Sequence, residues 1–502
     1  MPPPSRYPSR QNRDDRPRPD QRPRGGPRGG APGGGRGGPS AAPRTPGDLA
    51  RHAAYYRLAE QAEVFPVLSF EGPRTEQRPA LDAAFAHAIY DAVLRRWFTL
   101  EYVVRGLLQG NYDELEPPLK AALLAGAAQL LLLDRVPQHA AVNETVSWAK
   151  WATNPGAGGL VNAVLRKIIE ELLGGQPRRV EPTWGDRRDA IPLADGTALN
   201  IGRARLPEDP VERLAVATSH PRAILNRWAT QYGAETAAKV ALHDLLSPPT
   251  VLNIGATPPE SVGCVPHRAP NHGVFMGTRE ELTAVLAANP TVWAQDPASS
   301  AAVESVAGMT PNLVIDVCAG QGTKTRQLAR TFPRARIMAS DTDQVRLERL
   351  KEAAAYEPRI SVIDPVSMGR LQTGTADLVL LDVPCSNTGV LARRVEARYR
   401  FDAPQLERMA TTQRTIFANA MRLLKPGGAI LYATCSLERE ENEAIVDAAR
   451  ESGQYEPERV RRALPTGLPG DGAAEYADGA FSAVLVQRQA EARGGRSSRK
   501  RT

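Results

Sequence analysis

Cysteine is scarce in this sequence. Its 502 residues contain four cysteines: Cys264, Cys318, Cys385 and Cys435. No two of them have the C-x-x-C spacing of a zinc site or a redox pair, so we expect no bound metal. So few cysteines fit a reducing compartment, and we predict a cytoplasmic protein without structural disulfides.

Long apolar runs are also absent. No stretch reaches the ~18 apolar residues that a transmembrane helix needs, and no signal-peptide core is present, so we expect neither membrane insertion nor secretion. Aromatic residues make up only 5% of the chain, but hydrophobic residues make up 42%, which is ample for packed cores. A chain of this length predicts about two to four domains.

Positive charge prevails over negative charge. The formal net charge is +7 and the pI is near 9.3, which favours an acidic partner, most simply nucleic acid, although the tails carry part of the charge. Residues 1–48 are dominated by Pro, Gly and Arg. This composition predicts a disordered arm that either contacts RNA backbones or only solubilises the chain. Residues 491–502 predict a second basic, disordered tail.

Helical periodicity dominates residues 49–175. Apolar residues recur at helical spacing over Ala84–Leu108, Leu119–Ala152 and Gly159–Leu173, which predicts an all-α domain. The stretches LLLDRVPQHAAVNETV and GLVNAVLRK resemble the NusB-type RNA-binding helical fold. The helices alone indicate only a bundle, whereas the resemblance implies RNA binding.

The middle of the chain shows two further changes of composition. Residues 176–217, rich in Pro, Gly, Arg and Asp, predict an ordered linker. Residues 218–295 open with two helical stretches and a short strand, and we predict that they form the N-terminal subdomain of the second half. We interpret the histidines of this region as capping or packing residues rather than catalytic ones: His220, His243, His267 and His272.

Residues 296–490 have the pattern of a Rossmann-like α/β domain. LVIDVCAGQGTKTRQL (313–328) reads as a strand, a glycine turn and a helix. The next strands end in Asp341 and Asp364, and LVLLD ends in Asp382. An acid about 20 residues after the glycine turn is where a ribose diol is held, and the acid of the third strand is suited to accept from an adenine amino group.

The same pattern argues against a phosphorylated cofactor. The third glycine of G-x-G-x-x-G is replaced by Thr325, and no Walker GK[ST] is present. Carboxylates repel phosphate, so the acidic strand ends favour a nucleoside without phosphates. S-adenosylmethionine fits, because it has a ribose diol and a cationic sulfonium.

Two cysteines follow strands of this predicted sheet. LVLLDVPCSNTGV (378–390) places Cys385 after one strand, and AILYATCSL (429–437) brings Cys435 to the same edge. A strand end that leads into a helix N-terminus favours thiolate over thiol. We therefore predict that the two thiols, with Asp382, form a catalytic site.

Together, DVPCSNTGVLARR, LLKPGGAILYATCSLEREENE and DVCAGQGTKT resemble the Sun/Fmu-type (RsmB) ribosomal RNA cytosine-C5 methyltransferases, over roughly residues 50–490. The resemblance implies an all-α NusB-like domain followed by a Rossmann-like class I methyltransferase domain, an S-adenosylmethionine cofactor and a ribosomal RNA partner, and we expect a monomer. It implies that Cys435 is the nucleophile, that Cys385 assists product release, and that Asp382 serves the base or the donor. It places these residues at the donor: Cys318, Ala319, Gly320, Gln321, Gly322, Thr323, Lys324, Asp341, Asp364 and Asp382.

The glycine loop departs from the family pattern, in which CAAPGGK stands where this chain has CAGQGTK. Gly322 and Lys324 are kept. Loss of the proline and of one glycine predicts a change in loop rigidity or donor affinity. Four arginines after the Cys385 loop are candidates to hold RNA phosphates, the alternative being an ordinary solvated face: Arg393, Arg394, Arg398 and Arg400.

Three alternatives remain open from the sequence. The first is the same chemistry on transfer RNA, which the core sequence does not exclude. The second is an inactive RNA-binding assembly factor, suggested by the altered glycine loop and opposed by the two intact cysteines. The third is a DNA cytosine methyltransferase with Cys385 as nucleophile, which leaves Cys435 without a role.

Overall fold

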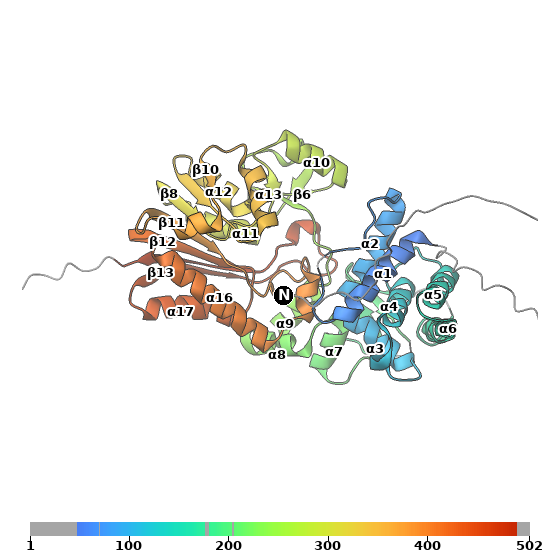
Figure 1. Cartoon of the computed structure of the whole chain (residues 1–502). Coiled ribbons are helices and arrows are strands. Elements are labelled where there is room, and N and C mark those ends of the chain that lie inside the picture. The colour runs from blue at the N-terminus through green and yellow to red at the C-terminus, as the bar shows by residue number, and fades with distance from the viewer. Residues whose placement is uncertain (1–47, 70, 176–179, 203–204, 489–502) are drawn as a thin grey trace, which may run out of the picture. The chain divides into compact units, whose positions relative to one another are not determined.

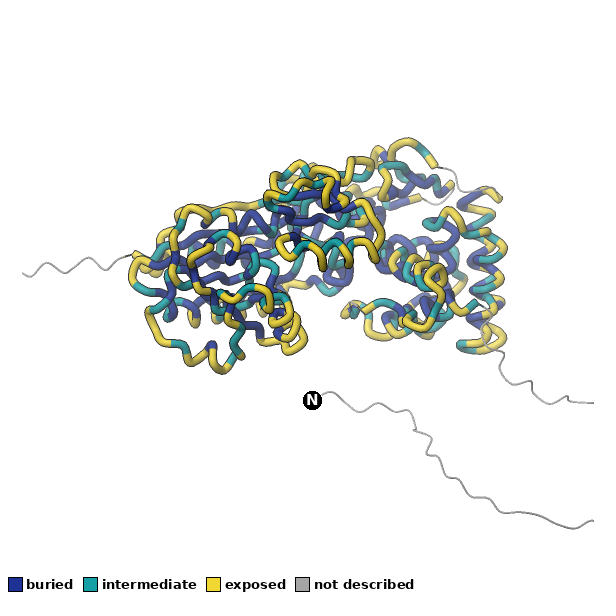
Figure 2. The backbone as a smooth tube through the Cα atoms, turned by 90° about the horizontal axis from the view of Figure 1, so that it is seen from above, coloured by how far each residue is buried: buried dark blue, intermediate teal, exposed yellow. Residues whose placement is uncertain are grey.

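The computed structural model describes residues 48–69, 71–175, 180–202 and 205–488, and these belong to one compact unit (Figure 1). The predicted basic arm (1–48) and tail (491–502) lie outside the described residues, apart from Asp48. None of the described helices is both long and apolar enough to cross a membrane. Buried residues lie in the interior of the molecule, and exposed residues concentrate on the outer turns and helix faces (Figure 2).

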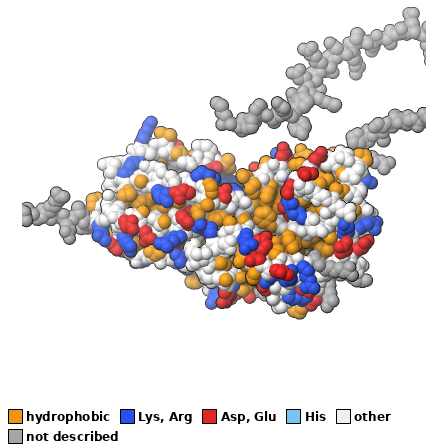
Figure 3. Space-filling model, turned by 90° about the horizontal axis from the view of Figure 1, so that it is seen from below, with side chains coloured by type: hydrophobic (Ala, Val, Ile, Leu, Met, Phe, Trp, Pro, Cys, Tyr) orange, Lys and Arg blue, Asp and Glu red, His pale blue; other side chains and the backbone are white. Residues whose placement is uncertain are grey.

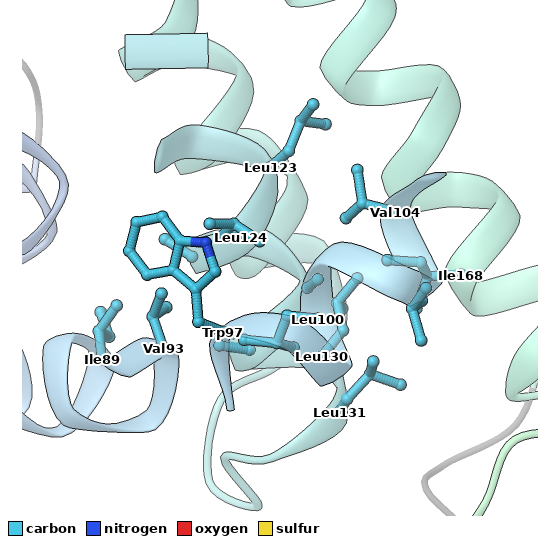
Figure 4. Packing of buried hydrophobic residues seen from close by; sticks show 14 of the residues in the cluster. Ile89, Val93, Trp97, Leu100, Val104, Leu123, Leu124, Leu130, Leu131 and Ile168 are labelled. Atoms are coloured by element: carbon cyan, nitrogen blue, oxygen red, sulfur yellow. The ribbon is translucent and has the colours of Figure 1, made fainter. Parts of the chain in front are cut away.

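The first part of the chain is helical, as its periodicity predicts. The apolar stretch 84–108 forms two helices rather than one, because the backbone leaves the helical region at Arg96, where φ is −128°. Trp97 starts the second of these helices and packs among Ile89, Val93 and Leu124 (Figure 4). The helices are α1 (Leu49–Val64), α2 (Ala80–Arg95), α3 (Trp97–Leu107), α4 (Pro117–Leu131), α5 (Gln138–Ala152) and α6 (Ala157–Lys167), with short turns η1 (Tyr112–Glu114) and η2 (Ile168–Leu172).

The predicted ordered linker, 176–217, contains regular structure of its own. Strands β1 (Val180–Glu181), β2 (Ala190–Pro192) and β3 (Ala198–Asn200) form an antiparallel sheet in the order β1-β3-β2, and α7 (Pro210–Thr218) follows. Ile191, Leu199 and Leu206 are fully buried in the same apolar cluster as the helical domain. This segment is therefore packed as an extension of the helices rather than as a spacer.

A small sheet precedes the Rossmann-like core. The two predicted helices and short strand are α8 (Arg222–Tyr232), α9 (Ala234–His243) and β4 (Val251–Asn253). Three further short strands, which the sequence did not predict, form a sheet with β4 in the order β5-β6-β4-β7. They are β5 (Cys264–Pro266), β6 (His272–Phe275) and β7 (Trp293–Ala294), accompanied by η3 (Pro259–Val262) and α10 (Arg279–Ala288).

The core is a seven-stranded sheet in the order β10-β9-β8-β11-β12-β14-β13. The first five strands in this order, β10, β9, β8, β11 and β12, run parallel to one another. Strand β14 is antiparallel to both of its neighbours, β12 and β13. The strands are β8 (Leu313–Asp316), β9 (Arg336–Ala339), β10 (Ile360–Val362), β11 (Ala376–Asp382), β12 (Leu424–Thr434), β13 (Tyr455–Ala463) and β14 (Ala480–Gln487). The remaining elements are α11 (Pro297–Glu304), α12 (Thr323–Thr331), α13 (Gln344–Ala354), α14 (Pro365–Gly369), α15 (Val395–Tyr399), α16 (Ala403–Met421), η4 (Arg439–Glu441), α17 (Glu443–Glu451) and η5 (Ala473–Glu475).

Helices cover both faces of this sheet, so its central strand is buried on both sides (Figure 1). Successive side chains of a strand point to opposite faces. In β11, Leu378 and Leu380 join the cluster under α12 and α13, whereas Val379 and Leu381 join the cluster under α16 and α17. This double burial explains why β11 reads as a continuous apolar run rather than an alternating one.

The segment after the Cys385 loop contacts the helical domain. Tyr399 donates a hydrogen bond from its hydroxyl to the carbonyl of Leu94, and Arg95 donates to the carbonyl of Ala392. Phe65 stacks on Trp97 and also contacts the ring of Tyr399. Polar and aromatic contacts thus join α15 directly to the helices.

Candidate active site

Four functional side chains meet at one edge of the sheet. Because β9, β8, β11 and β12 are parallel neighbours, their carboxyl ends lie along the same edge. Asp316 ends β8, Asp341 follows β9, Asp382 ends β11 and Cys435 follows β12. The placement predicted for Asp341, Asp382 and Cys435 is therefore observed, and Asp316 joins them at this edge.

The glycine loop between β8 and α12 is held by Asp341. Gly320 and Gly322 have φ values of +57° and +88°, which favour glycine. One carboxylate oxygen of Asp341 accepts a hydrogen bond from Gly320 N at 2.8 Å, and the other accepts from Asp343 N. A Cβ added to Gly320 would meet no atom within 4 Å, so the loop has open space beside it.

Thr325 and Asp316 form a buried pair beneath this loop. Thr325 stands where a dinucleotide fingerprint has its third glycine, and its hydroxyl donates to Asp316 Oδ2 at 2.7 Å. Both side chains are completely buried, and Asp316 Oδ1 has no protein partner. Burial raises the pKa of Asp316 to about 7. Our sequence interpretation missed Asp316, although an acid at the end of the first strand was a visible signal.

Lys324 connects the first turn of α12 with the end of β11. Its ammonium group lies 2.8 Å from Asp382 Oδ2. Burial disfavours the charged lysine, but the carboxylate of Asp382 outweighs burial and raises the lysine pKa. The pair places a fixed cation and anion near the thiol of Cys435.

Asp364 occupies a different position from the other acids. It caps α14, accepting from the backbone of Val366 and Ser367 and from the Ser367 hydroxyl. These hydrogen bonds lower its pKa, and the residue is exposed. Its predicted contact with an adenine amino group stays a prediction.

The two catalytic candidates among the cysteines touch each other. Cys385 Sγ lies 3.1 Å from Cys435 Sγ, and Cys435 also donates to Asn387 Oδ1 at 3.2 Å. Cys385 is only 8% exposed, whereas Cys435 is partly exposed. Cys435 is therefore the thiol that a ligand reaches first.

Their surroundings differ in charge as well as in access. The hydrogen bond to Cys435, burial, and the charges of Cys435 and Glu441 raise the pKa of Cys385 well above its ordinary value. Cys385 therefore holds its proton. Burial and three nearby carboxylates raise the pKa of Cys318 to about 12, so this thiol in the glycine loop is not an ionised nucleophile.

Close backbone contacts bring the two cysteine segments together. Gly389 N donates to the carbonyl of Cys435, and Leu437 N donates to the Thr388 hydroxyl. A Cβ on Gly389 would lie 2.9 Å from that carbonyl oxygen and 2.5 Å from the carbonyl oxygen of Gly479. Only glycine fits there, which explains why the SNTGV turn has glycine at position 389.

A buried carboxylate, Glu441, also lies behind the two cysteines. It follows the TC motif in η4 and accepts hydrogen bonds from Ser386 and Ser436, each next to a cysteine. We did not predict it, because the run EREENE reads as an exposed acidic helix start.

The structure corrects part of the predicted phosphate-binding set. Arg398 is completely buried and donates to the carbonyls of Arg95, Thr218, Ser219 and Asp244, so the prediction that it faces RNA is wrong. Arg393 pairs with Asp296 and Asp478, which already neutralise it. Arg394 and Arg400 are partly exposed, and their role stays a prediction.

The histidines have the packing roles that were predicted. His220, for example, is buried between Asp244 and Thr218, with hydrogen bonds of 3.0 and 2.9 Å. Among the described residues, no group of three or more His, Cys, Asp or Glu side chains is arranged to hold a metal ion.

The sheet, the glycine loop and the acidic strand ends define the second part of the chain as a Rossmann-like methyltransferase domain. Comparison with family models gives the same result. Residues 306–461 match the model of the 16S rRNA methyltransferase RsmB/F family, and residues 53–170 match that of the NusB family. The predicted combination of a NusB-like helical domain with a methyltransferase domain is thereby confirmed.

Curated relatives span most of the chain. Ribosomal RNA small subunit methyltransferase B of Vibrio cholerae is 28% identical over 87% of this chain and 96% of its own length. The protein of the same name from Xanthomonas campestris is 28% identical, covering 81% of this chain and 89% of the relative. A solved structure, that of the protein PH0851, has a TM-score of 0.64 over 86% of this chain and 98% of its own, at 19% identity, and so shares the fold.

Proposed function

We propose that this methyltransferase transfers the methyl group of S-adenosylmethionine to C5 of a cytosine in small-subunit ribosomal RNA. The observation that carries the proposal is the contact between the thiols of Cys385 and Cys435 at the carboxyl edge of the sheet. Methyl transfer to oxygen or nitrogen needs no protein thiol, whereas a cytosine carbon needs activation first. A pair of thiols in contact suits that activation.

The donor site is formed by the glycine loop and the acids around it. The backbone of Gly320 is open on one side, and the carboxylate of Asp341 that holds it is available to a ribose diol. S-adenosylmethionine supplies an electrophilic methyl group on a sulfonium, whose positive charge suits the partly exposed carboxylate of Asp382. The replacement of CAAPGGK by CAGQGTK keeps Gly322 and Lys324 and puts a second positive-φ glycine, Gly320, where the family pattern has alanine.

Cys435 starts the chemistry by covalent catalysis. Its thiolate adds to C6 of the cytosine, which makes C5 nucleophilic enough to take the methyl group. A base then removes the C5 proton, the C5–C6 double bond re-forms, and the thiolate of Cys435 leaves. The partial exposure of this thiol and its position beside the Lys324 ammonium group support the assignment.

Cys385 assists the last step. Because its pKa is raised, it remains a thiol and donates toward Cys435 Sγ when that sulfur becomes a thiolate. A hydrogen bond to a leaving thiolate stabilises it, so elimination is the step that Cys385 accelerates.

Most of the net positive charge that would attract RNA lies outside the described residues. Residues 1–47 hold ten arginines and three aspartates, so their net charge equals that of the whole chain and the remainder is neutral overall. On the face in Figure 3, basic and acidic side chains are interspersed. The N-terminal arm is therefore expected to supply much of the non-specific phosphate attraction, and the NusB domain and the cleft to supply the placement.

Label transfer tests the proposal directly. Purified enzyme is incubated with methyl-tritiated S-adenosylmethionine and small-subunit ribosomal RNA from cells that lack the protein, alongside transfer RNA and DNA. Label is expected in the ribosomal RNA as 5-methylcytosine, at one position that bisulfite mapping identifies. Label in transfer RNA alone would show that transfer RNA is the substrate instead. Absence of label from every nucleic acid would favour the alternative of an inactive assembly factor.

A further inference from the structure

Glu441 contacts both cysteine loops at once. Its Oε1 accepts from the backbone N of Ser386 at 2.9 Å and from Gln413 Nε2 at 3.0 Å. Its Oε2 accepts from the hydroxyls of Ser386 and Ser436. The carboxylate is completely buried, so water does not share these hydrogen bonds.

Each serine follows a catalytic candidate directly. Ser386 follows Cys385 in the loop after β11, and Ser436 follows Cys435 after β12. Their hydroxyls also lie 3.1 Å apart, and Gln413 donates a further hydrogen bond to the carbonyl of Pro384, on the other side of Cys385. One carboxylate is thereby joined to the residues next to both thiols.

The position of Glu441 is fixed from its own side too. The Tyr432 hydroxyl donates to the carbonyl of Glu441, and Tyr432 belongs to β12, which carries Cys435. Asn442, the next residue, accepts from Thr434 and donates to the carbonyl of Ser436. A buried, fully bonded carboxylate with a fixed backbone is a rigid anchor rather than a mobile acid.

We infer that Glu441 is a positioning residue that fastens the Cys385 loop to the Cys435 strand end and so sets the contact between the two thiols. This inference rests on the proposed function for its catalytic meaning. The thiol contact itself can be measured without RNA. An error of about 1 Å in the position of a reacting group can cost a factor of about 100 in rate, so kcat depends on this anchor.

Two substitutions separate the anchor from its charge. Glu441→Gln keeps an oxygen for Ser386 N and Gln413, and its amide can donate to the two serine hydroxyls, so the hydrogen-bonded link can persist. Glu441→Ala removes the link. Glu440→Ala is the matched control, because this neighbouring carboxylate pairs with Arg227 and is partly exposed.

The first measurement reports the distance between the thiols. Diamide, an azo compound, accepts two electrons and two protons from a thiol pair and leaves a disulfide. Wild type, Glu440→Ala and Glu441→Gln should form the Cys385–Cys435 disulfide at similar rates, found as a cross-linked peptide by mass spectrometry. Glu441→Ala should form it at least about tenfold more slowly.

The second measurement is catalytic. Glu441→Ala should lower the single-turnover methyl-transfer rate by about 10- to 100-fold, with S-adenosylmethionine affinity by calorimetry and RNA KM unchanged, and Glu441→Gln should recover most of the rate. A change confined to KM or to donor affinity would overturn the inference, as would wild-type cross-linking in Glu441→Ala. If Glu441→Ala does not fold, the folded variants Glu441→Gln and Glu440→Ala are compared instead. The inference would also be overturned if both of them lost the Cys385–Cys435 cross-link to the same extent. A wild-type enzyme that cross-links as expected but methylates no RNA would refute the proposed function and leave the anchoring role standing.

Discussion

The ammonium group of Lys324 lies 2.8 Å from the carboxylate of Asp382, and this ion pair joins the glycine loop to the strand that leads to Cys385. The lysine side chain is 13% exposed and the aspartate side chain is 35% exposed. The pair therefore connects the proposed donor site with the proposed base site, and the carboxylate of Asp382 favours the charged form of Lys324 by raising its pKa.

Asp382→Asn should leave the ammonium group of Lys324 without its anion and lower the lysine pKa. Because Asp382 is partly exposed, the loss of stability should be modest, about 1 kcal/mol, while methyl transfer should fall at least about tenfold. Thermal unfolding and single-turnover rates measure the two effects. In a double-mutant cycle with Lys324→Met, the combined loss should be smaller than the sum of the two single losses; strict additivity would show that the pair is not coupled.

Substitutions of the two proposed catalytic cysteines should have different effects. Cys435→Ser removes the thiolate that adds to C6, so neither adduct nor methylation should form, because a serine hydroxyl ionises far less. Cys385→Ser should permit attack and methyl transfer but slow elimination, so a protein–RNA adduct should survive denaturing electrophoresis. Cys264→Ala, in β5 of the small sheet, is the control. If only Cys435→Ser trapped an adduct, the roles of the two cysteines would be reversed. That result would support the alternative of a DNA cytosine methyltransferase with Cys385 as nucleophile.

Asp341→Ala should weaken S-adenosylmethionine binding by at least about tenfold, since hydrogen bonds to a charged group contribute about 1.5–3 kcal/mol. It should also release the Gly320 backbone that this carboxylate holds. Calorimetry measures the affinity. Asp343→Ala, an exposed cap of α13 two residues away, should destabilise the helix by about 1 kcal/mol and leave donor affinity unchanged. Unchanged affinity in Asp341→Ala would refute the ribose assignment.

The buried Asp316 should make stability depend on pH. Its pKa is about 7 in the folded protein and about 3.9 in an unfolded chain. Between these values the folded state binds more protons, so this group lowers the free energy of unfolding as pH rises from about 4 to about 7. Asp316→Asn should remove this contribution, and the stability of the variant relative to wild type should increase over that range. A constant difference in chemical denaturation would contradict the assignment.

Arg398→Ala should damage the fold rather than RNA binding. Four backbone carbonyls lose their donor in a completely buried site, so we expect destabilisation of about 3 kcal/mol or more, seen as a lower denaturation midpoint. Arg394→Ala is the matched case. It should change stability by less than about 0.5 kcal/mol, and if it contacts a phosphate of single-stranded RNA the salt slope of RNA binding should fall by about 0.7.

The sequence allowed the parallel part of the sheet to be predicted well. Buried strands such as β8 and β11 are continuous apolar runs, and the acids and cysteines that end them mark the edge where ligands bind. The glycine turn after β8 is a local signal of the same kind. These features depend on residues close in sequence, so pattern alone identifies them.

Features that depend on distant partners were not predicted. Arg398 looks like a surface charge in sequence, and only the carbonyls of α2, α7 and α9 around it explain its burial. Glu441 reads as part of an exposed acidic run, whereas Ser386, 55 residues away, supplies its partner. Strand β13 is polar and lies at the sheet edge, so its alternation carries little signal.

The antiparallel strand β14 has a consequence for the timing of folding. Cys435 emerges from β12, whose neighbours are β11 and β14, and β14 ends at Gln487, near the end of the chain. At a usual synthesis rate of about 5–20 residues per second, β12 waits several seconds for this neighbour. During that interval its outer edge is an unpaired apolar strand, which is prone to wrong pairing. The strand that carries Cys435 therefore completes its hydrogen bonding only after β14 has been synthesised.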